Sequence, residues 1–175
     1  NSCGYGVLVS NYFEYYKLSA YLRRYVTNPI GLVMGLNNLA DIFKEEYYSS
    51  MEGGILEAFG ILFKDNVKIY AYPIELENFE RYRKQIGIGD NVEVKTGEDG
   101  LVTIENLLVA KNLRNLYKYI RENGFLETII ECDRQNMKLF SRDVFEQVQS
   151  RKEGWKDCLP DCAAEMIEKK ELWKS

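Results

Sequence analysis

The stretch that decides the fold is Tyr5-Gly6-Val7-Leu8-Val9-Ser10-Asn11, which runs directly into a helical pattern over residues 12–25. Its apolar part predicts a short strand over Val7–Val9, and the polar Ser-Asn pair ends that strand. The helical pattern has apolar or aromatic residues at i, i+3, i+4 and i+7, namely Leu18, Tyr21, Leu22 and Tyr25. A strand that turns straight into a helix predicts the first unit of an α/β sheet.

Three later segments have the composition of strands. They are Pro29–Gly35, Val67–Tyr72 and Leu126–Ile130. Pro29–Gly35 is an unbroken apolar run, which is typical of a strand buried on both faces of a parallel sheet. We therefore expect an α/β fold in which these segments and Val7–Val9 form one mainly parallel sheet. Helices should cover both faces, as in a three-layer Rossmann-like domain.

The rest of the sequence predicts the helices and the division of the chain into domains. Helices are expected over 37–48, 54–63 and 113–122, the last ending at Asn123-Gly124. Residues 74–100 are rich in charge and glycine and predict an excursion from the sheet, with a short helix and a small hairpin. We expect an α/β domain over 1–140 and a helical C-terminal tail over 141–175 that packs on it.

Composition limits the classes of partner. The chain has 175 residues, 46% of them hydrophobic, which is enough for one core without a metal or disulfides. A net charge of -4 does not favour a phosphate backbone, so we expect no nucleic-acid partner. No apolar run approaches the roughly 20 residues of a membrane-spanning helix. Membrane contact is expected only through partner proteins, and no cofactor is expected.

The absence of histidine limits the chemistry more sharply. It excludes Ser-His-Asp and Cys-His nucleophile activation and any histidine ligand for zinc. Carboxylate, lysine, tyrosine and thiol chemistry stay open. No catalytic residue and no metal site are predicted, and the prediction for an enzyme leans towards no.

Cysteine usage bears on the compartment. The four cysteines are Cys3, Cys132, Cys158 and Cys162, and no secretory signal accompanies them. Reduced thiols in an intracellular, reducing compartment are therefore expected. The i, i+4 spacing of Cys158 and Cys162 leaves a metal or redox pair as the alternative, although Pro160 between them predicts a helix start. Because the chain begins at Asn1, a processed or fragmentary sequence is also expected.

One ligand site follows from the expected sheet. Ligands of open α/β sheets bind at the carboxyl ends of the strands. The residues expected to meet there are Ser10, Asn11, Gly35, Asn37 and Asn38. Backbone amides at the helix starts after Asn11 and Gly35 would suit an anion. The alternative is that these polar residues only cap helices and form turns.

The Leu-Val-Ser-Asn end of the first predicted strand resembles the second motif of haloacid-dehalogenase-like phosphohydrolases. In that superfamily a Ser or Thr at a strand end contacts phosphate, so the resemblance implies that role for Ser10 and a three-layer fold of that kind. The Asp-x-Asp nucleophile strand of the superfamily is not visible in this chain. It would have to lie upstream.

Longer blocks resemble a bacterial protein family whose members commonly carry the label nicotinate-nucleotide adenylyltransferase or TonB-dependent receptor. The blocks are 9–18, 52–60, 119–125 and 140–144. The chain resembles the C-terminal part of that family, which implies a large N-terminal portion in the relatives. The His-x-x-His turn and the Ile-Ser-Ser-Thr-x-x-Arg segment that grip ATP in true nucleotidyltransferases are missing, so the resemblance implies no catalytic residue.

Two functional hypotheses follow. The first is a non-catalytic α/β domain that serves as a subunit or docking module of a larger protein assembly. For a eukaryotic source this would be a mitochondrial complex, and otherwise the compartment would be the bacterial cytoplasm. The alternative is half of an enzyme acting on a nucleotide or phosphate ester, either adenylyltransferase-like or of the haloacid-dehalogenase kind.

Overall fold

The computed structural model describes residues 4–86, 92–95 and 100–173. Its α-helices are α1 (Tyr15–Leu22), α2 (Leu36–Asp41), α3 (Gly54–Leu62), α4 (Leu76–Ile86), α5 (Arg114–Glu122), α6 (Ser141–Gln149) and α7 (Asp161–Lys169). Short 3-10 helices are η1 (Glu45–Tyr48), η2 (Lys111–Leu113), η3 (Asn136–Lys138) and η4 (Trp155–Cys158). The strands are β1 (Ile30–Gly35), β2 (Val67–Tyr72), β3 (Ile74–Glu75), β4 (Glu93–Val94), β5 (Leu101–Val102), β6 (Leu107–Leu108) and β7 (Leu126–Thr128).

The main sheet has three parallel strands in the order β1-β2-β7. In register, Leu32 pairs with Ile69, and Ile69 pairs with Leu126. Two small antiparallel pairs, β3 with β5 and β4 with β6, lie in the segment between β2 and α5. The α/β class expected from the sequence is confirmed. Three of the four expected strands share the sheet.

The strand expected over Val7–Val9 is wrong. This segment is extended but pairs with no described strand, and Val9 is 90% exposed. An apolar run becomes a strand only when a neighbouring backbone satisfies its N–H and C=O groups. The sequence pattern carries no information about that neighbour.

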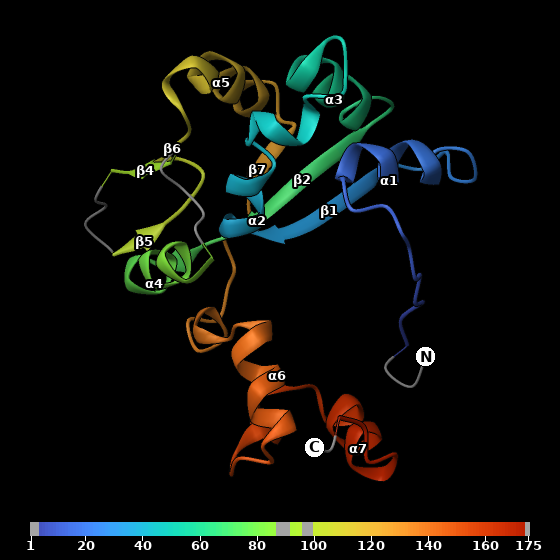
Figure 1. The fold of residues 1–175 in the computed structure, drawn as a ribbon, viewed down its shortest axis with the longest axis vertical. Coiled ribbons are helices and arrows are strands. Elements are labelled where there is room, and N and C mark those ends of the chain that lie inside the picture. The colour runs from blue at the N-terminus through green and yellow to red at the C-terminus, as the bar shows by residue number, and fades with distance from the viewer. Residues whose placement is uncertain (1–3, 87–91, 96–99, 174–175) are drawn as a thin grey trace. The chain divides into compact units, whose positions relative to one another are not determined.

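The helices that build the core pack against one face of the sheet. On α3, Ile55, Ala58, Phe59 and Leu62 follow helical spacing and are buried, and on α5 Tyr117 and Ile120 are buried. Phe43, after α2, makes edge-on ring contacts with Phe59 and Tyr117 at 5.1 and 5.2 Å between centroids. Figure 1 shows α3 and α5 on the same side of the strands.

Within the described residues of the 10–137 unit, the other face of this sheet is left partly open. Along β2 the side chains alternate, with Ile69 and Ala71 buried while Tyr70 is half-buried and Tyr72 exposed. Val33, in the middle of β1, is 67% exposed. The expectation that Pro29–Gly35 is buried on both faces is therefore wrong. The described residues support the α/β class and do not form a clear three-layer domain.

Strand order explains the uncovered face. Connections between parallel strands are almost always right-handed. When the order runs β1-β2-β7 without reversing, right-handed connections bring every crossover helix to the same face. A doubly wound domain needs a reversal of order to place helices on the second face. Strand order cannot be deduced from a hydrophobic pattern.

The chain divides into two compact units, one of residues 10–137 and one of 138–175 with the described part of 1–9. The C-terminal unit has a small core of its own. It consists of Val144, Val148, Trp155, Ala164 and Ile167. The predicted helix starts near Ser141 and Asp161 are confirmed by α6 and α7.

The cysteines differ from expectation in one respect. Cys132 and Cys158 are free, whereas Cys162 is disulfide-bonded. The expectation that all the thiols are reduced is therefore wrong for Cys162, and the alternative of a Cys158–Cys162 metal or redox pair is wrong as well. Cys3 lies outside the described residues.

Candidate functional site

The predicted ligand residues occupy two neighbouring places in the 10–137 unit. Ser10 and Asn11 are exposed and precede α1, where the Ser10 hydroxyl oxygen accepts a hydrogen bond from the backbone N–H of Tyr12 at 3.0 Å. Gly35 ends β1 and is the N-cap of α2. Asn37 and Asn38 lie inside the first turns of α2 rather than at its cap.

These residues do not converge on one anion site. Asn37 is buried, and its Oδ1 has no hydrogen-bond partner within the described chain. Asn38 is exposed. The helix α2 has only six residues, so its dipole offers little to an anion. Asn38 lines a pocket at this end of the sheet, and the lining of that pocket does not include Ser10, Asn11, Gly35 or Asn37.

We call this cavity the aromatic pocket. Its volume is about 210 Å³, and it is lined by Phe13, Glu14, Tyr15, Asn38, Asp41, Ile42, Tyr47 and Tyr48. Three elements supply the walls: the start of α1, the end of α2 and η1. Half of the lining side chains are aromatic and two are carboxylates. The residues that line it include no lysine or arginine.

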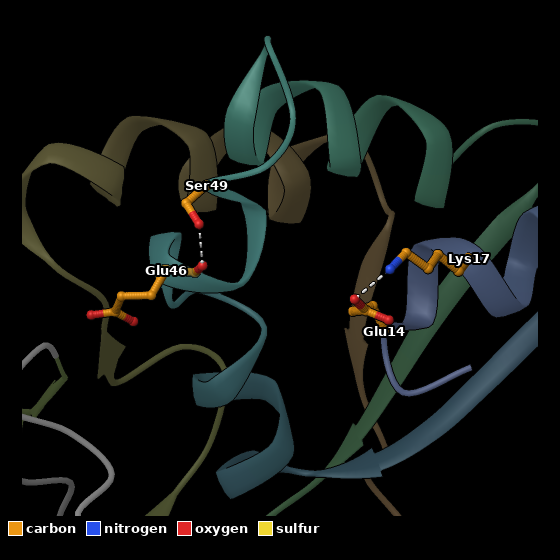
Figure 2. A network of polar contacts seen from close by, with 4 residues as sticks. All are labelled: Glu14, Lys17, Glu46 and Ser49. Carbon is orange, nitrogen blue, oxygen red and sulfur yellow. Dashed lines mark hydrogen bonds and ion pairs between the residues drawn. The ribbon is translucent and has the colours of Figure 1, made fainter. Parts of the chain in front are cut away.

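Hydrogen bonds hold the walls of the aromatic pocket. The Tyr48 hydroxyl donates to the Ile42 carbonyl at 2.7 Å, which ties η1 to the end of α2. Lys17 donates to Glu14 Oε1 at 2.6 Å in the first turn of α1, and the Ser49 hydroxyl donates to the Glu46 carbonyl at 3.0 Å after η1. Figure 2 shows these last two contacts. The walls are therefore held both by contacts within single elements and by the Tyr48 contact that joins η1 to α2.

Burial sets the ionisation of the two partly or fully buried tyrosines that line the pocket. Burial raises the pKa of Tyr48, with smaller contributions from Tyr16, Glu14 and Tyr47. Burial also raises the pKa of Tyr15, helped by the nearby Asp41 carboxylate. The hydrogen bond from Lys17 holds the pKa of Glu14 below its usual value. Both phenols are thus neutral at physiological pH, and Glu14 is ionised.

A second cavity, which we call the edge groove, runs beside β7. It has a volume of about 730 Å³ and is lined by Ile104, Glu105, Lys118, Arg121, Glu122, Leu126, Glu127, Thr128 and Ile130. The Thr128 hydroxyl donates to the Glu105 carboxylate at 3.1 Å, and Lys118 pairs with Glu122 at 3.6 Å. Three carboxylates against two cations give this lining a net negative charge.

The third feature is the uncovered side of the parallel sheet, which we call the open face. It consists of Gly31, Val33, Gly35, Lys68, Tyr70, Tyr72 and Glu127. A Cβ at Gly31 would lie 3.1 Å from the Tyr70 ring, and one at Gly35 would lie 2.9 Å from the Tyr72 hydroxyl oxygen. The two tyrosine rings therefore lie across β1, where the glycines leave room for them.

The described residues provide neither a metal-binding cluster nor a membrane-spanning helix. Within 4–86, 92–95 and 100–173, no group of three or more carboxylate or thiol side chains is placed to hold a metal ion. None of the helices that the structure describes has both the length and the apolar character to cross a bilayer.

Comparison with known proteins adds no assignment: no family model, no curated protein and no solved structure matches this chain. The resemblances to the bacterial family and to the phosphohydrolase motif therefore stay predictions. Sequence reasoning did not find the pocket residues Tyr15, Asp41, Tyr47 and Tyr48. The only available signal was the pair of Tyr-Tyr dipeptides at 15–16 and 47–48.

Proposed function

We propose that this chain is a non-catalytic α/β docking module, a subunit of a larger protein assembly, and that it binds a partner protein through the open face. The observation that carries the proposal is Val33, an apolar residue at the centre of β1 that is 67% exposed. Parallel sheets occur almost only with both faces covered. A partner chain would supply the missing layer.

The composition of the open face suits a protein partner. Val33, Tyr70 and Tyr72 provide an apolar and aromatic centre, and aromatic side chains are enriched at such centres. Lys68 and Glu127 form an ion pair at 2.6 Å on the same face, and both are 43% exposed. This arrangement of an apolar centre beside a polar pair matches the core and rim of protein interfaces. The partner surface should be apolar, with few charges.

The alternative enzyme hypothesis has less support. A phosphate ester would need a positively charged site, and the edge groove, with a volume of about 730 Å³, has a net negative lining. The Arg121 guanidinium lies over the Tyr117 ring at 5.7 Å, while Lys118 is paired with Glu122. We therefore keep the phosphate-ester or nucleotide enzyme as the second hypothesis.

Native mass measurement of the tagged chain, purified from its source, tests the proposal. We expect a defined complex of fixed stoichiometry that is lost in Val33→Lys. The matched control is Tyr25→Lys, because Tyr25 is 72% exposed, follows α1 and is not one of the residues that make up the open face. A free monomer in the unmodified protein, or equal loss in both variants, would overturn the proposal.

A further inference from the structure

The aromatic pocket has a composition that the docking function does not use. Its lining includes four aromatic side chains, Phe13, Tyr15, Tyr47 and Tyr48, and two carboxylates, Glu14 and Asp41. Aromatic faces attract cations, most strongly where water is excluded. A cavity of about 210 Å³ is smaller than the 300 to 1,000 Å³ typical of drug-sized ligands, so it suits a small ion.

The structure already contains ammonium groups in the same chemical setting. Lys44 Nζ lies 2.7 Å from Asp41 Oδ1 and 5.8 Å from the centroid of the Tyr47 ring. Lys17 Nζ lies 2.6 Å from Glu14 Oε1 and 5.6 Å from the centroid of the Tyr16 ring. Each lysine thus combines a carboxylate with a tyrosine ring. Neither lysine is among the residues that line the pocket.

The Lys44–Asp41 and Lys17–Glu14 ion pairs also determine which kind of cation the pocket can bind. Because each carboxylate already accepts a short contact from a lysine, a second ammonium with N–H donors would have to compete for it. A quaternary ammonium, such as a trimethylammonium group, has no such donors and is weakly hydrated, and it gains mainly from contact with aromatic faces. We propose that the aromatic pocket binds a small organic cation bearing a trimethylammonium group.

Calorimetric titration with choline tests this inference on the purified chain. The control ligand is 3,3-dimethylbutan-1-ol, which has the same shape without the charge. We expect choline to bind at least about tenfold more tightly, which corresponds to about 1.4 kcal/mol of cation recognition. Equal binding of the two compounds, or no binding of choline, would overturn the proposal.

Variants of Tyr47 and Lys44 locate the site. Tyr47→Leu should weaken choline binding about five- to thirtyfold, while Tyr47→Phe keeps the ring and should change it less than about threefold. Lys44→Met removes the cation already lying over Tyr47 and should strengthen binding. Tyr119→Leu, at an exposed position of α5 outside the pocket, is the matched control. Equal effects of Tyr47→Leu and Tyr119→Leu would contradict this site.

Phosphocholine distinguishes free choline from a lipid headgroup. The lining of the aromatic pocket offers no lysine or arginine to pair with its phosphate, so we expect phosphocholine to bind more weakly than choline. Tighter binding of phosphocholine would contradict free choline as the ligand. Thermal unfolding of every variant, compared with the unmodified chain, shows whether a loss of binding comes from loss of the fold.

Discussion

The two faces of the parallel sheet are made by the same three strands but differ in what covers them. On one face Ile69, Ala71 and Leu126 are at most 2% exposed and pack beneath helices. On the open face Val33 is 67% exposed. Because successive side chains of a strand alternate between faces, the difference arises from strand order and helix placement rather than from local sequence. The open face is the part of the fold that another chain would complete.

Truncation of one side chain on each face of the sheet should lower the free energy of unfolding by very different amounts. Ile69→Ala leaves a cavity in the core and should lower the free energy of unfolding by about 2 to 5 kcal/mol. Val33→Ala removes an exposed side chain and should cost no more than about 0.5 kcal/mol. Urea unfolding measures both. Similar losses would show that the open face is covered within this chain.

Alkaline pH should lower the stability of the fold, because Tyr117 on the covered side of the sheet resists ionisation when it is buried. This residue is buried, its hydroxyl donates to the Ile104 carbonyl at 2.8 Å, and burial raises its pKa. The unfolded chain therefore loses the phenolic proton first, near pH about 10, and stability falls as the pH rises further. From this one group, the free energy of unfolding should fall by about 1.4 kcal/mol for each pH unit.

Tyr117→Phe tests that slope. At neutral pH the variant should lose about 1 kcal/mol with its hydrogen bond. Above pH about 10 its stability should fall less steeply than that of the unmodified protein, so that the two curves approach each other. Val33→Ala serves as a control, and its stability should fall with pH as steeply as that of the unmodified protein. Parallel curves for Tyr117→Phe and the unmodified chain would refute the assignment.

The smallest effect concerns packing on the open face itself. Ala normally stabilises a strand relative to Gly, but at Gly31 the added Cβ would lie 3.1 Å from the Tyr70 ring. Gly31→Ala should therefore lower stability by about 1 kcal/mol. In a Tyr70→Ala background the same change should be neutral or stabilising. An additive double-mutant cycle would mean that the ring does not lie over β1.

Local patterns predicted several elements well. The spacing of Ile55, Phe59 and Leu62 predicted α3, and Asn123-Gly124 predicted the end of α5, where Gly124 has φ of +68°. The helix expected over 37–48 is broken into α2 and η1, because the chain turns between Ile42 and Lys44 and buries Phe43. Such a turn depends on tertiary packing, which local propensity does not contain.

The site was harder to predict than the fold. The expected ligand set assumed that Ser10 and Asn11 end a strand, and without that strand they lie in an exposed segment before α1. The aromatic pocket joins residues from α1, α2 and η1, so its composition depends on how these elements pack. The open face depends on strand order. Neither follows from a periodicity within one segment.

The most direct test of the central claim is covalent footprinting of Val33 and Tyr72, by carbene or hydroxyl radical, in the purified chain and in the assembly isolated from its source. We expect both residues to be labelled in the free chain and protected in the assembly, while exposed Tyr25 is labelled in both states. Equal labelling of Val33 in the two states would contradict docking through the open face. Protection of Val33 in the free chain would contradict the open face itself.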